Sequence, residues 1–356
     1  MMSRPAGVID VRYEQDIAII RTLPQWITLG LFLLFLLLLP KLFPARYLLN
    51  VINIIMIMTI SIHGLNILTG FAGQISVGHA AFMGVGAYAC ASFMTLWGLS
   101  FWICLPLSGL TAGLVGVLFG LPSLRLKGFY LAMATIAAQF IITSFFFHFK
   151  PELFRGAQGM NIEPVRLGSI VFDNQENLYY LILPIAALMT FFARNLVRSR
   201  MGRAFVAMRD NDLAAEIMGI SLFAYKLRAF FIGCFFAGIA GALYIAFMRM
   251  IRPDQYSLMD SIWMLGIIII GGMGSILGGI LGTIFVKVLD EFMLALVPLL
   301  GSILPRELAS RLSASMGLVV FGLVVVLFLI LEPRGLAHRW EILKNRFRHW
   351  PFTYGH

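Results

Sequence analysis

Neutral polar side chains gather inside one long apolar region near the start of the chain. After His63 they recur at intervals of two to five residues, and the first ones, three residues apart, share one helix face. Inside a bilayer such groups either hydrogen-bond to neighbouring helices or line a path for a polar solute. The residues alone leave both interpretations open. The candidates for a solute path are Asn66, Thr69, Gln74, Ser76 and His79.

Glycines interrupt this region and a second region nearer the end of the chain. Because glycine lacks a Cβ atom, it permits a break in a helix or the close approach of two backbones. The four-residue spacing of Gly274, Gly278 and Gly282 favours close helix packing. The G-x-x-G pattern shared by 70–73 and 271–274 is typical of related breaks in two halves of a transporter. The glycines expected at such positions are Gly70, Gly73, Gly78, Gly271, Gly274 and Gly278.

A polar connection at 197–226 carries a third pattern. Asp212 is a suitable N-cap and Gly219 a suitable residue to end a helix, so about two turns of helix are expected between them. A helix this short is marginal alone in water, and we expect it to dock against another surface. Its defining residues are Asp212, Ala214, Ala215, Glu216 and Gly219.

The sequence lacks the residue patterns that ATP hydrolysis, metal binding and disulfide formation require. There is no G-x-x-x-x-G-K-[ST] phosphate loop, so the chain is not expected to hydrolyse ATP itself. The histidines show no metal-ligand spacing, and the three cysteines sit in apolar stretches without a C-x-x-C pair. We therefore expect no catalytic residues, no metal site and no cofactor bound by this chain.

Acidic residues are nearly absent from the apolar stretches. The exception is Lys287 with Asp290 and Glu291, at spacings that favour a local ion pair over a proton relay. A secondary transporter driven by an ion gradient needs a buried acid or an ion cage, and a membrane enzyme needs clustered His, Asp or Glu. Both classes fit the sequence less well than a transport subunit energised from outside.

The composition requires a lipid environment. Hydrophobic residues make up 60% and charged residues 12% of the 356 residues, and the mean hydropathy is +0.90. Soluble domains average about 45–50% apolar and about 25% charged residues. A membrane-spanning helix needs about 20 apolar residues, which predicts an all-α bundle with about ten spans. The stretches are 26–43, 47–68, 78–97, 101–124, 128–148, 178–196, 227–248, 258–272, 275–297 and 312–331.

The basic residues predict the orientation of these spans. Ten crossings with both termini in the cytoplasm place seventeen lysines and arginines inside and nine outside, as the positive-inside rule requires. The net charge of +10 therefore reflects the membrane and not a nucleic-acid partner. The expected organisation is a cytoplasmic segment at 1–25, a membrane domain at 26–332 with the cytoplasmic loop 197–226, and a basic cytoplasmic tail at 333–356. Residues 258–297 contain either two full spans or broken helices.

The polar connection at 197–226 resembles the coupling loop of permeases from bacterial ATP-binding-cassette importers. The signature of that coupling loop is Glu-Ala-Ala, three further residues and Gly. Ala214, Ala215 and Gly219 fit it, while Leu213 stands where the signature has Glu. More narrowly, the chain is similar to the LivM family, over about residues 50–336. The matching segments are 64–70, 78–82, 86–88, 124–132, 199–204, 225–230, 237–244, 271–282 and 333–336.

This resemblance implies the remaining parts of an importer. They are a sister permease, two cytoplasmic ATPase subunits that use the ATP, and a periplasmic substrate-binding protein, all at the bacterial inner membrane. The resemblance also implies that residues 210–220 couple the ATPases to the spans. The implied substrates are leucine, isoleucine and valine. Permeases for urea and short amides share these motifs and stay open as an alternative, as does an ion-coupled amino-acid transporter.

Overall fold

The computed structural model describes residues 23–43, 45–149, 156–167, 170–303 and 306–349. Almost all regular structure within them is helical, which confirms the all-α prediction. The helices are α2 (Leu23–Leu42), α3 (Arg46–Leu65), α4 (His79–Leu96), α5 (Phe101–Gly120), α6 (Phe129–His148), α8 (Gln175–Arg198), α9 (Arg200–Asp210), α10 (Asp212–Ile217), α11 (Leu222–Met248), α12 (Leu258–Gly271), α13 (Ile276–Ile303), α14 (Arg306–Leu331) and α15 (Gly335–His349).

Ten of these helices coincide with the ten apolar stretches of the sequence: α2, α3, α4, α5, α6, α8, α11, α12, α13 and α14. Among the described residues, six helices are long and apolar enough to cross a membrane, or up to eight spans if each of two bent pairs counts as one. The chain is therefore a multi-pass membrane protein. The count of ten crossings stays a prediction.

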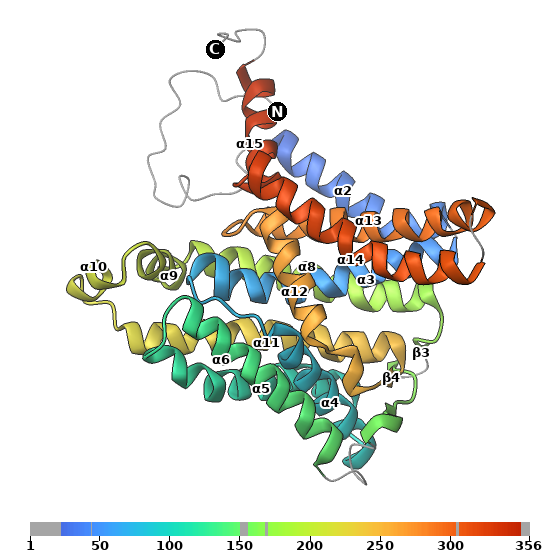
Figure 1. The fold of residues 1–356 in the computed structure, drawn as a ribbon, viewed down its shortest axis with the longest axis horizontal. Coiled ribbons are helices and arrows are strands. Elements are labelled where there is room, and N and C mark those ends of the chain that lie inside the picture. The colour runs from blue at the N-terminus through green and yellow to red at the C-terminus, as the bar shows by residue number, and fades with distance from the viewer. Residues whose placement is uncertain (1–22, 44, 150–155, 168–169, 304–305, 350–356) are drawn as a thin grey trace.

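Helix α11 lies at the centre of the bundle, packed against α3, α4 and α5 (Figure 1). Glycines on facing surfaces make this packing close. A Cβ atom built on Gly86 would lie 2.3 Å from the Cα of Gly238, and one on Gly64 would lie 2.4 Å from the carbonyl oxygen of Gly233. In a membrane, helices associate through van der Waals contact, which such small residues maximise.

The bundle has two distinct ends (Figure 1). Helices α9 and α10 lie at one of them, which we call the α10 end. At the opposite end, the β4 end, strand β1 (Met160–Asn161) pairs antiparallel with β4 (Met250–Ile251), and β2 (Arg166–Leu167) pairs with β3 (Ile170–Val171). An ion pair between Arg249 and Asp173 joins the start of α8 to the end of α11 there.

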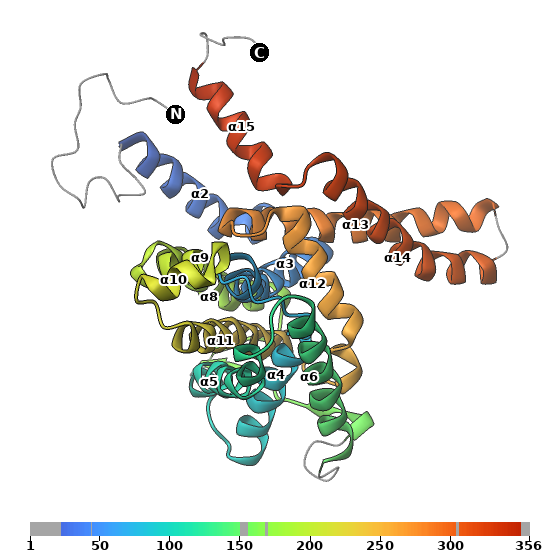
Figure 2. The same ribbon diagram turned by 60° about the vertical axis from the view of Figure 1, so that its left-hand side comes forward.

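Helices α12 to α15 form the last part of the described chain, and the first two of them pack against α3 of the bundle. The chain bends by 117° between α12 and α13, and by 49° between α14 and α15. Helices α13 and α14 run side by side along one flank of the bundle, and α15 leads away from it (Figure 2). Residues 258–297 are thus two helices joined by a sharp bend.

Candidate functional site

The first glycine-rich region breaks a helix inside the bundle. Helix α3 ends in a π-helix, η1 (Asn66–Phe71), the chain continues without helix through 72–78, and α4 begins at His79. Thr69 stabilises this break, because its hydroxyl donates to the carbonyl of Gln74 at 3.1 Å and accepts from the backbone of Ser76 at 3.4 Å. Single π-helical turns of this kind are frequent at functional sites.

The start of α4 lies buried, and side chains from two other helices satisfy its backbone. The first N–H groups of a helix have no partner within it and are costly to bury alone. Ser261 of α12 and Gln139 of α6 accept hydrogen bonds of 2.9 and 3.0 Å from two of them, and Thr135 of α6 accepts one of 2.9 Å from the residue before the N-cap. The backbone donors are Val77, Ala80 and Ala81.

The second glycine region lies against the first. Gly272 and Gly274, between α12 and α13, adopt positive φ angles of 107° and 78°. The amide of Asn66 accepts from the backbone N–H of Gly274 and donates to the carbonyl of Ser275, both at 2.8 Å. A Cβ atom at Gly70 would lie 2.5 Å from the nitrogen of Gly274. Two breaks about 200 residues apart in sequence, the separation of this contact, therefore form one joint.

The remaining predicted glycines also lie at close contacts. A Cβ atom on Gly78 would approach the carbonyl oxygen of Thr135 to 2.2 Å. A Cβ atom on Gly271 would lie 2.1 Å from the carbonyl oxygen of Gly278, and one on Gly278 would lie 2.6 Å from that of Gly271. Their helices approach at backbone distance, which leaves no room for a side chain.

The connection between α8 and α11 is more helical than the sequence predicted, since α9 fills its first half. Helix α10 has the expected length, but its N-cap is Asn211, whose side chain accepts from the N–H of Ala214 at 3.1 Å. The assignment of Asp212 as N-cap was wrong by one residue. Gly219 ends the helix at φ +84°, with the N–H of Ile220 bonded to the carbonyl of Ala215, a Schellman motif.

Arg209, the penultimate residue of α9, reaches both helix breaks. Its Nη1 donates to the carbonyl oxygen of Gly70 at 2.9 Å. A Cβ atom on Gly274 would lie 3.1 Å from the same nitrogen, and one on Gly73 would lie 2.9 Å from the Cγ of Arg209. Gly73 has a φ angle of +67°. The arginine thus connects the loop helices to the joint formed by the two breaks.

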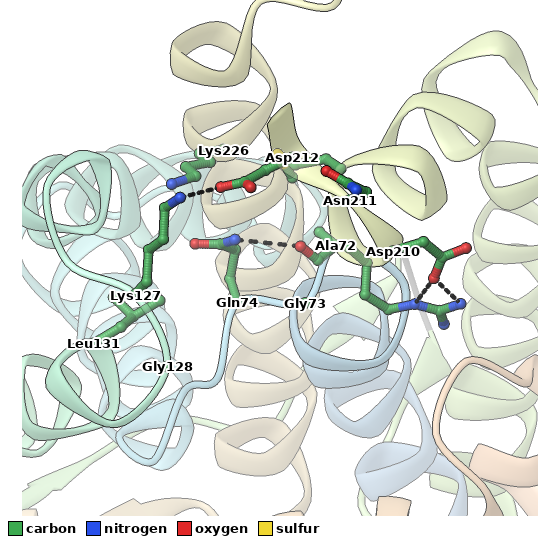
Figure 3. A pocket seen from close by; sticks show the side chains of 12 residues that line it. Ala72, Gly73, Gln74, Lys127, Gly128, Leu131, Asp210, Asn211, Asp212 and Lys226 are labelled. Carbon is green, nitrogen blue, oxygen red and sulfur yellow. Dashed lines mark hydrogen bonds and ion pairs between the residues drawn. The ribbon is translucent and has the colours of Figure 1, made fainter. Parts of the chain in front are cut away.

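A cavity of about 340 Å³ lies between this joint and the loop helices (Figure 3). Gln74, Asp212 and Lys226 line it, and Lys127 on the turn before α6 forms an ion pair with Asp212 across it. The hydrogen bond from Lys127 holds the pKa of Asp212 below its ordinary value. The cavity therefore joins four segments at the α10 end: residues 72–74, 127–131, 208–212 and Lys226.

The outer face of α10 is apolar although it lies outside the candidate spans. Leu213, Ile217 and Met218 are 68%, 79% and 82% exposed, whereas Ala215 is buried against the chain itself. Ala214, Glu216 and Gly219 are exposed as well. Large exposed apolar side chains grouped on one helix are typical of a protein-binding surface.

The structure separates the predicted path residues. Gln74 lines the cavity, while Asn66 and Thr69 form the hydrogen bonds that hold the first break. His79 is buried and its Nε2 lies 3.1 Å from the carbonyl oxygen of Ser61; Ser76 is fully buried. Six side chains that bond within this region or line its cavity were not among the predicted site residues, and only those at 127 and 226 lay in segments marked by the family resemblance. They are Lys127, Thr135, Gln139, Arg209, Lys226 and Ser261.

Comparison with known proteins gives a consistent result. The family model described as branched-chain amino acid transport system / permease component matches residues 47–329. The Escherichia coli (strain K12) high-affinity branched-chain amino acid transport system permease protein LivM is 31% identical over 333 residues, which are 86% of this chain and 74% of that protein.

Two further relatives carry similar names. The LivM protein of Salmonella typhimurium is 30% identical over 77% of this chain and 66% of its own length. A probable branched-chain amino acid transport permease protein LivM of Methanocaldococcus jannaschii is 25% identical over 68% of this chain and 69% of its own length. No solved structure matches the chain. Because the family model covers most of the chain, this protein belongs to the permease components of branched-chain amino acid transport systems.

Proposed function

We propose that the chain is the membrane permease subunit of an ATP-binding-cassette importer for leucine, isoleucine and valine. The observation that carries the mechanism is the path of contacts from α10 to the helix breaks. An exposed apolar helix outside the candidate spans is tied, through Arg209, to the joint that the α3–α4 and α12–α13 breaks form at the α10 end. Such an arrangement suits a subunit that receives mechanical work by contact and performs no chemistry itself.

The contact path suggests how this work is transmitted. Residues 210–220 bind a groove on an ATPase subunit through Leu213, Ile217 and Met218. A displacement of α10 moves Asp212 and its partner Lys127, and with them the turn before α6. The same displacement pulls Arg209 against Gly70, so the two breaks change their packing together. Broken helices are suited to this role because a few backbone angles absorb the motion.

The importer proposed here contains further subunits. They are a sister permease that shares the translocation path, two cytoplasmic ATPase subunits that use ATP, and a periplasmic substrate-binding protein. Membership in the permease components of branched-chain amino acid transport systems supports a multi-subunit assembly. This chain is proposed to bind neither ATP nor another cofactor, and no nucleic acid.

We further propose ten crossings of the bacterial inner membrane with both termini in the cytoplasm. Loops at 72–78, 121–128, 199–221, 272–275 and 332–335 make contacts with one another at the α10 end, which supports this alternation. The segments 156–173 and 249–252 meet at the β4 end. The proposed domains are the cytoplasmic segment 1–25, the membrane domain 26–332 and the basic tail 333–356.

Of the five path candidates, Gln74 is the one proposed to contact a solute, since its side chain lines the cavity at the α10 end. The hydrogen bonds of Asn66, Thr69 and His79 support a role in holding the break. Ser76 is buried beside them.

Reconstitution tests the proposal. The chain is purified with its sister permease and ATPase subunits, placed in proteoliposomes and supplied with the binding protein. We expect ATP-dependent uptake of leucine, isoleucine and valine, without competition from urea or acetamide. Uptake driven by an ion gradient in the absence of ATP would contradict the proposal, and so would ATP-dependent uptake restricted to urea or amides.

A further inference from the structure

A second cavity, of about 220 Å³, lies among three apolar helices away from the α10 end. Ile54 and Met58 of α3, Trp263 of α12 and the aliphatic residues beside them form its apolar walls. Three ionisable side chains line the same space: Asp260 of α12, and Lys287 and Asp290 of α13. A pocket with apolar walls and a few convergent charges of both signs is the usual form of a small-molecule site.

Charged side chains in this position carry a free-energy cost. Lysine and aspartate are rare within membrane-spanning helices because taking their charge into the bilayer is costly, so such residues are retained mostly for function. Lys287 does not fully offset this cost through its neighbours. Its Nζ lies 3.9 Å from Asp290 Oδ2 and 3.7 Å from Glu291 Oε1, beyond hydrogen-bond distance in both cases. The ammonium group of Lys287 therefore keeps donor capacity for a ligand.

The two carboxylates come from different helices. Asp260 is fixed at the start of α12 by a capping box, in which its Oδ2 accepts from the backbone N–H of Ser257 at 2.9 Å. Asp290 belongs to α13, one turn from Lys287. A ligand between α12 and α13 can thus meet negative groups on both sides and a positive group on one.

We propose that this cavity binds the transported amino acid as a zwitterion. The ammonium group of the ligand lies between Asp260 and Asp290, its carboxylate accepts from Lys287, and its branched side chain packs against Ile54, Met58 and Trp263. Charge-assisted hydrogen bonds of this kind are stronger than neutral ones. The proposal rests on the proposed function, whose substrates carry both charges and an apolar side chain.

The position of the cavity agrees with this role. It lies next to the capping box at the start of α12, which follows β4, and Glu291 beside it bonds to Tyr47 at the start of α3. In the proposed orientation this half of the bundle faces the periplasm, where a binding protein releases its ligand. The cavity at the α10 end lies on the opposite side.

Cysteine protection tests the site separately from transport. Ile54→Cys places a thiol on the cavity wall, and the three native cysteines are buried. In the assembled complex, we expect millimolar leucine to slow modification of this thiol by a maleimide. 3-Methylbutylamine and 4-methylpentanoate, which each lack one charge, are expected to protect about tenfold less well, the equivalent of about 1.4 kcal/mol. Absence of protection by leucine, or equal protection by the amine, overturns the proposal.

A matched pair of variants distinguishes binding from charge balance. Asp290 lines the cavity and Glu291 does not, although both lie near Lys287. In the Ile54→Cys background, Asp290→Asn and Lys287→Met are expected to weaken leucine protection about tenfold, whereas Glu291→Gln leaves it unchanged. Equal effects of Asp290→Asn and Glu291→Gln would show that Lys287, Asp290 and Glu291 form a structural charge cluster. That result would overturn the proposed binding site.

The two proposals can fail separately. Leucine protection in a complex that takes up no branched-chain amino acid keeps the site and rejects the proposed function. Uptake of leucine with no protection of the thiol keeps the proposed function and rejects the binding site. Co-purification of all subunits and a single symmetric peak in size-exclusion chromatography show that each variant is folded.

Discussion

The Nη1 atom of Arg209 donates a hydrogen bond to the carbonyl oxygen of Gly70, 2.9 Å away and 139 residues earlier in the chain. The carbonyl belongs to the π-helix at the end of α3, and the arginine to the helix that precedes α10. The bond therefore joins a broken membrane helix to the helix proposed to meet the ATPase.

Replacing Arg209 with Met should uncouple ATP hydrolysis from uptake. A hydrogen bond to a charged group contributes about 1.5–3 kcal/mol, so its loss releases the joint while the buried bundle stays folded. We expect leucine uptake to fall about tenfold or more with ATP hydrolysis largely retained. Arg203→Met is the matched control. Arg203 also lies on α9, but it donates to the carbonyl of Arg198 at the end of α8 and not to a helix break. Equal losses in both variants would show that positive charge alone matters.

Gly219 is predicted to be needed for its conformation and not for space. Its φ angle is +84°, and no atom lies within 4 Å of a Cβ atom built on it. Gly219→Val should strain the end of α10 by about 1–3 kcal/mol and weaken binding of the ATPase subunits. Asn tolerates this conformation better, so Gly219→Asn should retain most binding. Co-purification of the ATPase subunits measures both, and a valine variant with normal assembly would contradict the prediction.

Gly78→Leu should prevent normal assembly of the bundle. The added Cβ would meet the carbonyl oxygen of Thr135 at 2.2 Å, a backbone atom that cannot move without α6. We expect loss of folded protein or of uptake, measured by size-exclusion chromatography in detergent and by transport. Gly322→Leu in α14 has nothing within 4 Å of the added Cβ and should be neutral.

The ion pair between Lys127 and Asp212 should contribute modestly, because both side chains are partly exposed. Exposed pairs contribute about 0.2–1 kcal/mol, so Lys127→Asp should lower uptake a few-fold. The double variant Lys127→Asp with Asp212→Lys should recover part of the loss. Failure of the exchange to restore any uptake would exclude an electrostatic role for the pair.

The same pair predicts a pH dependence. Lys127 lowers the pKa of Asp212 in the folded protein, so this contribution is complete above the ordinary carboxylate pKa and is lost as the pH falls through the lowered value. Coupling between uptake and ATP hydrolysis should therefore not change through titration of Asp212 between pH 6 and pH 8. A difference between the intact protein and Asp212→Asn that appears or vanishes within that interval would contradict this assignment.

Labelling tests the orientation of the chain. Single cysteines replace exposed residues in the background of the buried native cysteines. Glu216→Cys and Lys344→Cys should be shielded from an impermeant reagent in intact cells, while Asn174→Cys should react. Reaction at position 216 or 344 from outside would reject the proposed topology.

Sequence periodicity located the helices well, because apolar runs of membrane length admit few other structures. The glycines located the break at Gly70–Gly78 and the end of the short helix at Gly219, because glycine permits backbone conformations and close contacts that other residues do not. The sequence did not indicate which side chains bond to the backbone at these breaks. Nothing local in Gln139 or Ser261 indicates that they cap α4, because those bonds form between helices distant in sequence. The one-residue error at Asp212 arose because Asn and Asp are equally good N-caps and stand side by side.

Helix α11 fills the centre of the bundle, yet it is synthesised after α3, α4 and α5, the helices that surround it. Until it arrives, the glycine surfaces at Gly64 and Gly86 lack the backbone against which they pack. The bundle cannot close helix by helix as the chain emerges, and its closure depends on contacts between distant parts of the sequence. Between the synthesis of α5 and that of α11, the growing chain therefore holds glycine surfaces whose partner helix does not yet exist.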